Sequence, residues 1–129
     1  MRKITRDAAT AFFEGRTKTI GNTHAAVSGE VSRLYLHGNL IAEYRRDTGG
    51  MFVTLAGWDT VTTRERINGL LTVAHEYGIV THNCGIVRRR GVPHFVFRGD
   101  GSARVYRHAI HDDQWITIPT RYSAKVQAA

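Results

Sequence analysis

The stretch TTRERINGLLTVAHEYG, residues 62–78, carries the strongest periodic signal in the chain. Its apolar residues recur at the spacing of one helix face, and they are Ile67, Leu70, Leu71, Ala74 and Tyr77. Thr62 with Glu65 predicts a capping box at the start of this helix, and Gly78 predicts its end. Gly69 inside the helix costs up to about 1 kcal/mol relative to alanine. A close contact between helix and sheet at Gly69 would explain its presence.

Alternating runs before this helix predict strands that it can cover. THAAVS (23–28) and VSRLYLH (31–37) flank a turn at Gly29 and predict a β-hairpin. LIAEYRR (40–46) and MFVTLA (51–56), joined by the turn residues DTGG, extend the hairpin to a four-stranded antiparallel meander. Nearer the start of the chain, Thr5 is expected to cap a short helix over residues 6–14, which ends at Gly15. Residues 16–22 are expected to be a linker.

Four further runs after the helix predict a second set of strands. They are IVTHNCGIVRRR (79–90), VPHFVFR (92–98), SARVYRH (102–108) and QWITI (114–118). Gly91 and the pair Asp100-Gly101 are expected to make the turns of two hairpins. The predicted class is α+β, with a mostly antiparallel sheet, one main central helix and a short N-terminal helix packed on the sheet. Residues 1–120 are expected to form a single domain, followed by a polar, weakly basic tail over 121–129.

Charge and cysteine content narrow the possible functions. The 129 residues carry a net charge of +7, and the 18 basic residues are 15 arginines and 3 lysines. Guanidinium groups grip phosphates and stack on bases, so the excess of arginine favours a nucleic-acid partner, although GC-rich coding also raises arginine content. The single cysteine, Cys84, cannot form an internal disulfide. We therefore expect a cytoplasmic protein with no membrane partner.

The positive charge is concentrated in GIVRRRGVPHFVFRGDGSARVYRH, residues 85–108. Six arginines against one acid leave this segment at +5 of the total of +7. On a strand, Arg89 would point opposite to Arg88 and Arg90. All three can bind one ligand only if the run lies at a strand end, and Gly91 permits that. The sequence predicts a basic hairpin tip, against the alternative of a solvated run of charges.

A repeated pattern suggests how a ligand would be held. Arg33-x-Tyr35-x-His37 and Arg104-x-Tyr106-x-His108 would each present a charge and two rings from one sheet face. Rings that stack on bases beside a basic groove are typical of single-strand binding, whereas the main helix is too poor in basic residues to read duplex DNA. The alternative is two ordinary half-exposed strands. The candidate nucleic-acid-binding residues are Arg33, Tyr35, Arg45, Arg46, Arg88, Arg89, Arg90, Arg98, Arg104, Tyr106, Arg107, Arg121 and Lys125.

The other aromatic and reactive residues are expected to be structural. Trp58, Trp115, Phe95 and Phe97 are predicted to belong to the core. A metal or nuclease centre would have to use the group His82, Cys84, His108, His111, Asp112 and Asp113. Their spacing matches no metal motif, and no nucleotide-binding loop or nucleophile elbow is present. We therefore expect a non-enzymatic protein without metal or cofactor.

Two stretches resemble small proteins of lytic bacteriophages. They are LYLHGNLIA (34–42) and LAGWDTVTTRERINGLL (55–71). The resemblance implies a single-stranded DNA-binding cofactor of a phage-encoded RNA polymerase, which holds melted promoter DNA and recruits the polymerase. Such a protein is expected to be a homo-oligomer, because joined copies hold a longer strand. The alternative is an interaction protein that inhibits or redirects a host enzyme through its basic face. The preference for DNA or RNA stays open.

Overall fold

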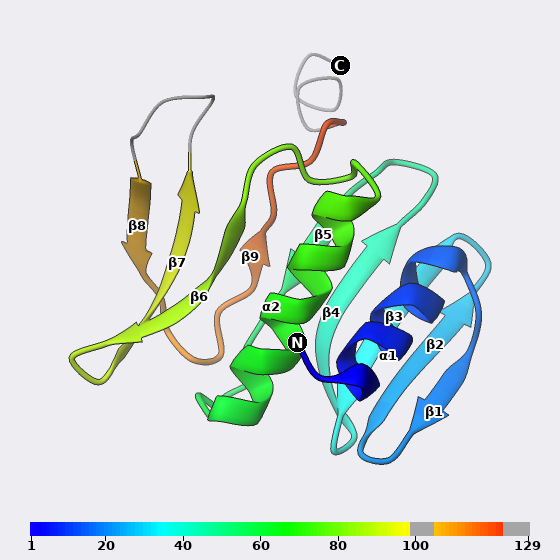
Figure 1. The fold of residues 1–129 in the computed structure, drawn as a ribbon, viewed down its shortest axis with the longest axis horizontal. Helices are drawn as coiled ribbons and strands as arrows, with labels where there is room; N and C mark the ends of the chain where they lie inside the picture. Colours follow the sequence, from blue (N-terminus) through cyan, green and yellow to red (C-terminus); the bar gives the residue numbers. More distant parts are fainter. Residues whose placement is uncertain (99–104, 123–129) are drawn as a thin grey trace.

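The computed structural model describes residues 1–98 and 105–122 and has an α+β fold, which confirms the predicted class (Figure 1). A six-stranded sheet has the order β1-β2-β3-β4-β5-β9, and a three-stranded sheet has the order β6-β7-β8. The helices are α1 (Lys3–Glu14) and α2 (Val61–Glu76). The strands are β1 (Lys18–Ile20), β2 (Thr23–Ser28), β3 (Val31–Leu36), β4 (Asn39–Arg45), β5 (Met51–Val53), β6 (Cys84–Arg89), β7 (Val92–Arg98), β8 (Val105–Ala109) and β9 (Ile116–Thr117).

The predicted meander forms the centre of the large sheet. Strands β2 to β5 pair in sequence order, all antiparallel, as expected. The segment expected to be a linker supplies an edge strand, β1, which pairs with β2. In β3, Ser32, Leu34 and Leu36 are buried and the residues between them are half-buried, so the strand alternates as predicted. A strand that alternates in this way has one covered face and one open face.

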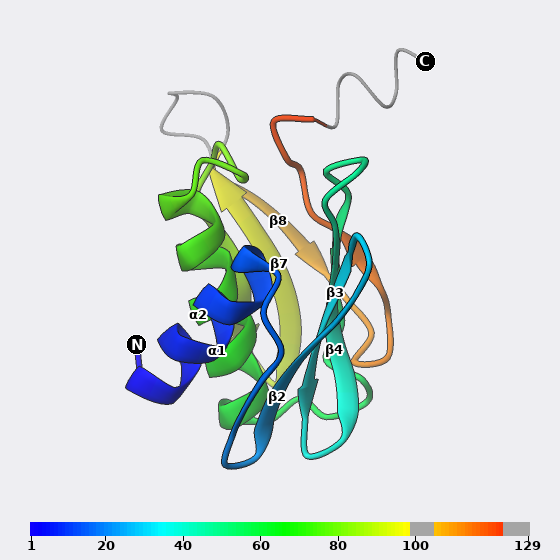
Figure 2. The same cartoon turned by 90° about the vertical axis from the view of Figure 1, so that its right-hand side faces the viewer.

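Both helices cover the same face of the large sheet (Figures 1 and 2). Phe12 of α1 and Ile67 and Leu70 of α2 are fully buried and pack with Leu34 of the sheet in one hydrophobic cluster. The helix prediction for residues 62–78 is therefore confirmed in its buried face at Ile67, Leu70, Leu71 and Ala74, whereas Tyr77, expected on that face, is 44% exposed. No described helix combines the length and apolarity that crossing a bilayer requires.

Both helices start earlier than predicted, and neither has the predicted N-cap residue. The first turn of α2 is capped by Thr60, whose hydroxyl accepts a hydrogen bond from the Thr63 amide at 3.1 Å. The expected Thr62–Glu65 capping box is wrong. The first helix begins three residues early, with Arg2 as an N-cap that makes no side-chain bond. Thr5 is therefore not a cap but a buried residue inside α1.

The helix ends follow the glycines, and the internal glycine has a different neighbour than expected. Gly15 and Gly78 adopt φ of 73° and 72°, in the left-handed region that glycine favours, as predicted. A Cβ on Gly69 would lie 2.3 Å from Thr5 Cγ2. Gly69 thus allows α1 to approach α2, and the expected contact between helix and sheet at this position is wrong.

The small sheet packs on the common core and is also hydrogen-bonded to α2 through the Asn68 side chain. The Asn68 amide donates to the Ile86 carbonyl at 2.9 Å and accepts from the Ile86 amide at 2.7 Å. A side chain on Gly85 would lie 2.9 Å from Asn68 Oδ1. Phe95 is buried and Phe97 packs against the core, as predicted. The β7–β8 hairpin is confirmed by its pairing, while its expected turn at Asp100-Gly101 lies outside the described residues.

Replacing Asn68 is expected to loosen this attachment. Asn68→Ala removes both hydrogen bonds and leaves two backbone groups of β6 without their partner, which costs about 1–3 kcal/mol of unfolding free energy. Urea denaturation measures the loss, and hydrogen exchange should show a less protected Ile86 amide. Thr72→Ala, one turn further along the exposed side of α2, is the control and should change stability by about 0.5 kcal/mol or less. Equal stability of the two variants would contradict the role of Asn68.

The chain stays attached to the fold as far as the last described residues. Ile118 donates from its backbone amide to the Met51 carbonyl at 2.9 Å, which continues the pairing of β9 with β5. The Arg121 amide donates to the Ile79 carbonyl at 3.0 Å. Residues 123–129 of the expected tail lie outside the described residues.

Candidate nucleic-acid interface

The predicted binding residues divide between the two sheets. Arg33, Tyr35 and Arg45 lie on strands of the six-stranded sheet. The Arg88–Arg89 end of β6 and Arg107 of β8 lie in the three-stranded sheet. The two copies of the Arg-x-Tyr-x-His pattern therefore do not share a sheet, and the single sheet surface expected from the sequence is wrong. The reason is the path of the chain, which starts a second sheet after α2 instead of continuing the first.

On the open face of the large sheet, the arginines have partners within the protein. The Glu43 carboxylate lies between Arg33, at 3.1 Å from its Nε, and Arg45, at 3.5 Å from its Nε. The Tyr35 ring lies beside the His24 ring, with 6.1 Å between centroids. Arg33, Arg45 and Glu43 together carry a net charge of only +1. An anionic strand would therefore gain little binding energy on this face.

Arg46, just after the end of β4, is also paired within the protein, and His37 lies outside β3. Arg46 donates to the Ser32 hydroxyl at 2.5 Å and to the Gly29 carbonyl, and lies 3.9 Å from Glu30. His37, the third member of the first pattern, is not on β3 but in the following turn, with φ of 51°. The strand ends one residue before it, so His37 does not share the face of Arg33 and Tyr35.

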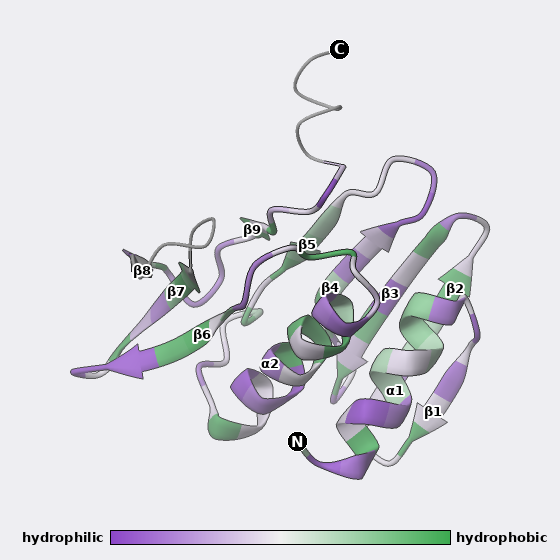
Figure 3. Cartoon of the chain, turned by 45° about the horizontal axis from the view of Figure 1, so that its top comes forward, coloured by the Kyte–Doolittle hydropathy of each residue, from purple (hydrophilic) through white to green (hydrophobic). Residues whose placement is uncertain are grey.

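The three consecutive arginines lie at a hairpin tip, as predicted. Arg89 pairs with Val92 across the turn, and Arg90 and Gly91 adopt φ of 51° and 78°, the signs of a type I′ turn. Arg88 lies 3.6 Å from the Asp59 carboxylate. Arg89 lines a cleft with residues of β7 and β8, so it points away from Arg88, in agreement with strand alternation. Figure 3 shows the hydrophilic end of β6 projecting away from both helices.

The cleft beside this tip is basic. It has a volume of about 440 Å³ and is lined by Arg89, Arg90, Val92, His94, Arg107 and Ala109. Within residues 1–98 and 105–122, no carboxylate forms an ion pair with Arg89, Arg90 or Arg107. The His94 Nδ1 is 2.9 Å from the Val92 carbonyl oxygen. Three guanidinium groups around one hollow repel one another, and a bound phosphate reduces that repulsion. We call these four side chains, Arg89, Arg90, His94 and Arg107, the basic cleft.

The remaining predicted residues contribute less to a described site. Arg98 and Tyr106 occupy neighbouring strands of the small sheet. Arg104 and Lys125 lie outside the described residues. The Arg121 guanidinium lies over the Tyr122 ring, 4.7 Å from its centroid, and donates to the Tyr122 hydroxyl. Of the predicted residues that the structure describes, Arg89, Arg90 and Arg107 come together around the cleft, with Arg88 on the other side of the same tip.

A family comparison places the chain among phage proteins. The model of the Kyanoviridae Gp96 protein family matches residues 1–102. The chain belongs to this family. The match runs from α1 through β7 and includes the arginine tip. The bacteriophage origin expected from the sequence is therefore confirmed. No curated protein and no solved structure matches.

The tryptophans of this Gp96-family protein are not core residues. Trp58 is 58% exposed and Trp115 is 47% exposed, so the expectation that both are buried is wrong. Trp58 lies in the connection from β5 to α2, next to Gly57, whose φ is 84°. A tryptophan between a glycine and an aspartate is a signal of a surface turn, which could have indicated its exposure. Tyr35, favoured as a stacking ring, is less available because it lies half-buried beside His24.

The reactive groups of the Gp96-family chain show no gathered centre in the described part. Burial raises the pKa of the Cys84 thiol to about 12, so the thiol stays protonated at neutral pH. Among residues 1–98 and 105–122, no three His, Cys, Asp or Glu side chains are placed to hold a metal ion.

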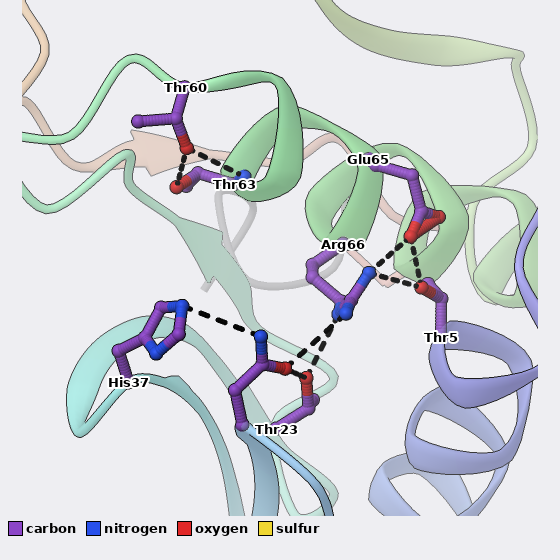
Figure 4. Close-up of polar contacts among 8 residues, drawn as sticks. Thr5, Thr23, His37, Thr60, Thr63, Glu65 and Arg66 are labelled. Atoms are coloured by element: carbon purple, nitrogen blue, oxygen red, sulfur yellow. Dashed lines mark hydrogen bonds and ion pairs between the residues drawn. The ribbon is translucent and has the colours of Figure 1, made fainter.

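One buried arginine was missed by the sequence analysis. Arg66 of α2 is 1% exposed and joins both helices to the large sheet (Figure 4). Its Nε donates to Thr23 at 2.9 Å, its Nη1 to Thr5 at 3.1 Å and Glu65 at 2.5 Å, and its Nη2 to Asn22 at 3.3 Å. Arg66 lies four residues before Leu70 on the buried helix face, and that spacing is the signal in the sequence. These contacts make Arg66 a structural residue.

Proposed function

We propose that this phage protein binds single-stranded nucleic acid through the basic cleft at the β6–β7 tip. The observation that carries the proposal is the gathering of Arg89, Arg90 and Arg107 without an acidic partner among the described residues. Arg33, Arg45 and Arg88, by contrast, are paired with Glu43 or Asp59. A site whose charges are not neutralised internally gains most from an anionic partner.

A single strand fits this site better than a duplex. The basic cleft lies on a strand hairpin, and duplex readers commonly insert a helix into the major groove. The first turn of α2 holds Arg64 and Arg66, but Arg64 is paired with Asp59 and Arg66 is buried. Neither can contact a groove without breaking contacts inside the protein. A hairpin that follows the phosphates of an unpaired strand needs no such rearrangement.

A titration with salt and a matched variant tests the proposal. Labelled single-stranded DNA, single-stranded RNA and duplex DNA are titrated by fluorescence anisotropy with wild type and with the R89A/R90A/R107A variant. Neutralising about three phosphates predicts a slope of log affinity against log salt of about −2 for a single strand. We expect the variant to lose most of this slope and at least about tenfold in affinity at low salt.

The control variant removes three arginines that lie outside the basic cleft. The R2A/R6A/R16A variant lowers the net charge by the same three units, and Arg6 and Arg16 are exposed and paired with Glu76 and Glu14. It should keep affinity within about threefold of wild type. Equal losses in both variants would show that only overall charge matters, and this result would sink the proposed site. No affinity for any oligonucleotide at moderate salt would favour the interaction protein that targets a host enzyme.

A role in phage transcription is the finer part of this proposal. The resemblance in residues 34–42 and 55–71 supports it, and it makes the bound strand an unpaired region of a promoter inside the host cell. Phage RNA polymerase should then initiate more often on a template with a premelted promoter when the protein is added. The R89A/R90A/R107A variant should not stimulate initiation. A homo-oligomer would hold a longer strand, and light scattering of the free protein measures its mass.

A further inference from the structure

A second hollow lies at the start of α2, on the other side of the arginine tip. Its volume is about 390 Å³, which is within the range of small-ligand pockets of about 300–1,000 Å³. We call it the Trp58 pocket, and it is lined by Leu36, His37, Asn39, Ile41, Leu55, Trp58, Thr60, Thr62 and Thr63. The proposed function does not use it.

The Trp58 pocket has an apolar floor and a polar rim. Leu36, Ile41 and Leu55 are 3% exposed or less and form the floor. The indole of Trp58 is 58% exposed at the mouth. A large apolar ring left in water next to an apolar hollow is unfavourable, and a flat ligand that covers the ring would bury both.

The polar residues of the rim are held by the fold. The His37 amide donates to the Asn22 carbonyl at 2.9 Å, and its Nε2 is 3.4 Å from the Asn22 side-chain nitrogen. Figure 4 shows His37 on the turn that faces the first turn of α2, where the hydroxyls of Thr60 and Thr63 are 2.9 Å apart. The Asn39 amide can both donate and accept, as can an imidazole ring. These groups are suited to the polar edge of a planar heterocycle.

Ion pairs connect the Trp58 pocket with the arginine tip. Asp59 follows Trp58 in the chain and pairs with both Arg64 and Arg88. This group, like the one at Glu43, has a net charge of only +1, so the phosphates of the strand are held by the basic cleft and not at the pocket. Arg88 belongs to the same tip as the basic cleft, and the β6–β7 turn and the start of α2 lie at the same end of the molecule (Figure 1). A strand whose phosphates lie along the tip can reach the pocket.

We propose that the Trp58 pocket binds one unpaired base of the strand, stacked on the Trp58 indole. The inference rests on the proposed function, because the strand is held by the basic cleft. It assigns to Trp58 the stacking role that the sequence analysis gave to Tyr35 and Tyr106. Stacking a base on an aromatic ring changes affinity by about 5- to 150-fold, and we expect Trp58→Ala to weaken single-strand binding within this range.

Fluorescence and an abasic probe test the inference. In a Trp115→Phe background, Trp58 is the remaining tryptophan, and its emission should be quenched when single-stranded DNA binds. An oligonucleotide of the same length made of abasic sites keeps the phosphates and lacks the bases. Wild type should bind it more weakly than normal DNA, whereas the Trp58→Ala variant should bind both probes equally. Trp58→Phe should restore part of the lost affinity.

The outcomes separate this inference from the proposed function. Trp115→Ala is the control, because Trp115 is also exposed but does not line the pocket, and it should bind like wild type. Wild-type affinity of Trp58→Ala with unchanged Trp58 emission would overturn the base pocket while leaving the basic cleft in place. Absence of any single-strand binding by wild type would overturn the proposed function, and the base pocket with it. Circular dichroism of each variant checks that it is folded.

Discussion

Arg66→Ala is expected to lower the free energy of unfolding by about 3–5 kcal/mol, because it removes one partner of a buried ionic network. The guanidinium donates to four side chains from three parts of the chain, and Figure 4 shows it between α1, α2 and the start of β2. Its removal leaves the Glu65 carboxylate without its cationic partner, with the Thr5 hydroxyl still donating to it, and leaves the Thr23 hydroxyl without the donor Nε. It also leaves a void at a residue that is 1% exposed.

This loss includes the penalty of leaving the partners of Arg66 buried and unpaired. It is therefore larger than the net contribution of the network to stability. Arg66→Lys separates charge from geometry. The ammonium keeps the charge but cannot place donors in the directions of Nε, Nη1 and Nη2, so its loss should be intermediate. Urea denaturation of wild type and of both variants at neutral pH measures the two losses in unfolding free energy.

An exposed ion pair provides the control. Arg6 bonds Glu76 at 2.9 Å, with both side chains about half exposed, so water screens the pair and Arg6→Ala should destabilise the protein far less than Arg66→Ala. If Arg66→Ala were no more destabilising than Arg6→Ala, the network would not be holding the helices to the sheet.

Gly69→Ala is expected to destabilise the protein although alanine is the better helix former. The exchange favours the helix by about 1 kcal/mol in isolation. The new Cβ would lie 2.3 Å from Thr5 Cγ2, so α1 and α2 must separate or Thr5 must move. Overpacking of this kind costs about 1–3 kcal/mol, and Thr5 is held by its bonds to Arg66 and Glu65. We expect a net loss of about 1–2 kcal/mol in thermal or urea denaturation.

A double mutant tests the cause of that loss. Thr5→Ser removes the methyl group that meets the new Cβ and keeps the hydroxyl that bonds Arg66. In the T5S/G69A variant, the Gly69→Ala substitution should become neutral or stabilising. The coupling energy between the two sites should therefore be about 1 kcal/mol or more. Additive effects of the two substitutions would show that the helix contact is not the reason for glycine at position 69.

The local elements could be predicted from the sequence because their signals are local. The heptad-like spacing from Ile67 to Ala74 is a property of one helix, and it predicted the buried face of α2. Turn glycines such as Gly15 and Gly91 predicted chain reversals because few other residues adopt positive φ at low cost. Strand alternation also predicted that Arg88 and Arg89 point apart. The cap predictions failed because three threonines, Thr60, Thr62 and Thr63, lie near the start of α2, and because α1 begins after Arg2 with no side-chain cap.

The candidate site could be predicted only in part. Arginine clustering indicated the β6–β7 tip correctly, because adjacent residues stay adjacent in any fold. The exposure of Trp58 was not predicted, since a tryptophan between two elements is compatible with a core position or a surface turn. The pairing of Arg33 and Arg45 with Glu43 depends on strand register, which places all three on one sheet face.

Composition, periodicity and turn residues in the chain establish an α+β protein with a meander, a covering helix and a basic hairpin. Each of these features depends on residues within a few positions of one another. The division into two sheets, the burial of Arg66 and the Trp58 pocket depend on contacts between segments that lie 18 to 61 residues apart, such as Asn68 with Ile86 and Arg66 with Thr5. Such contacts form only when the whole chain is packed, because no local pattern specifies which distant partner a side chain meets.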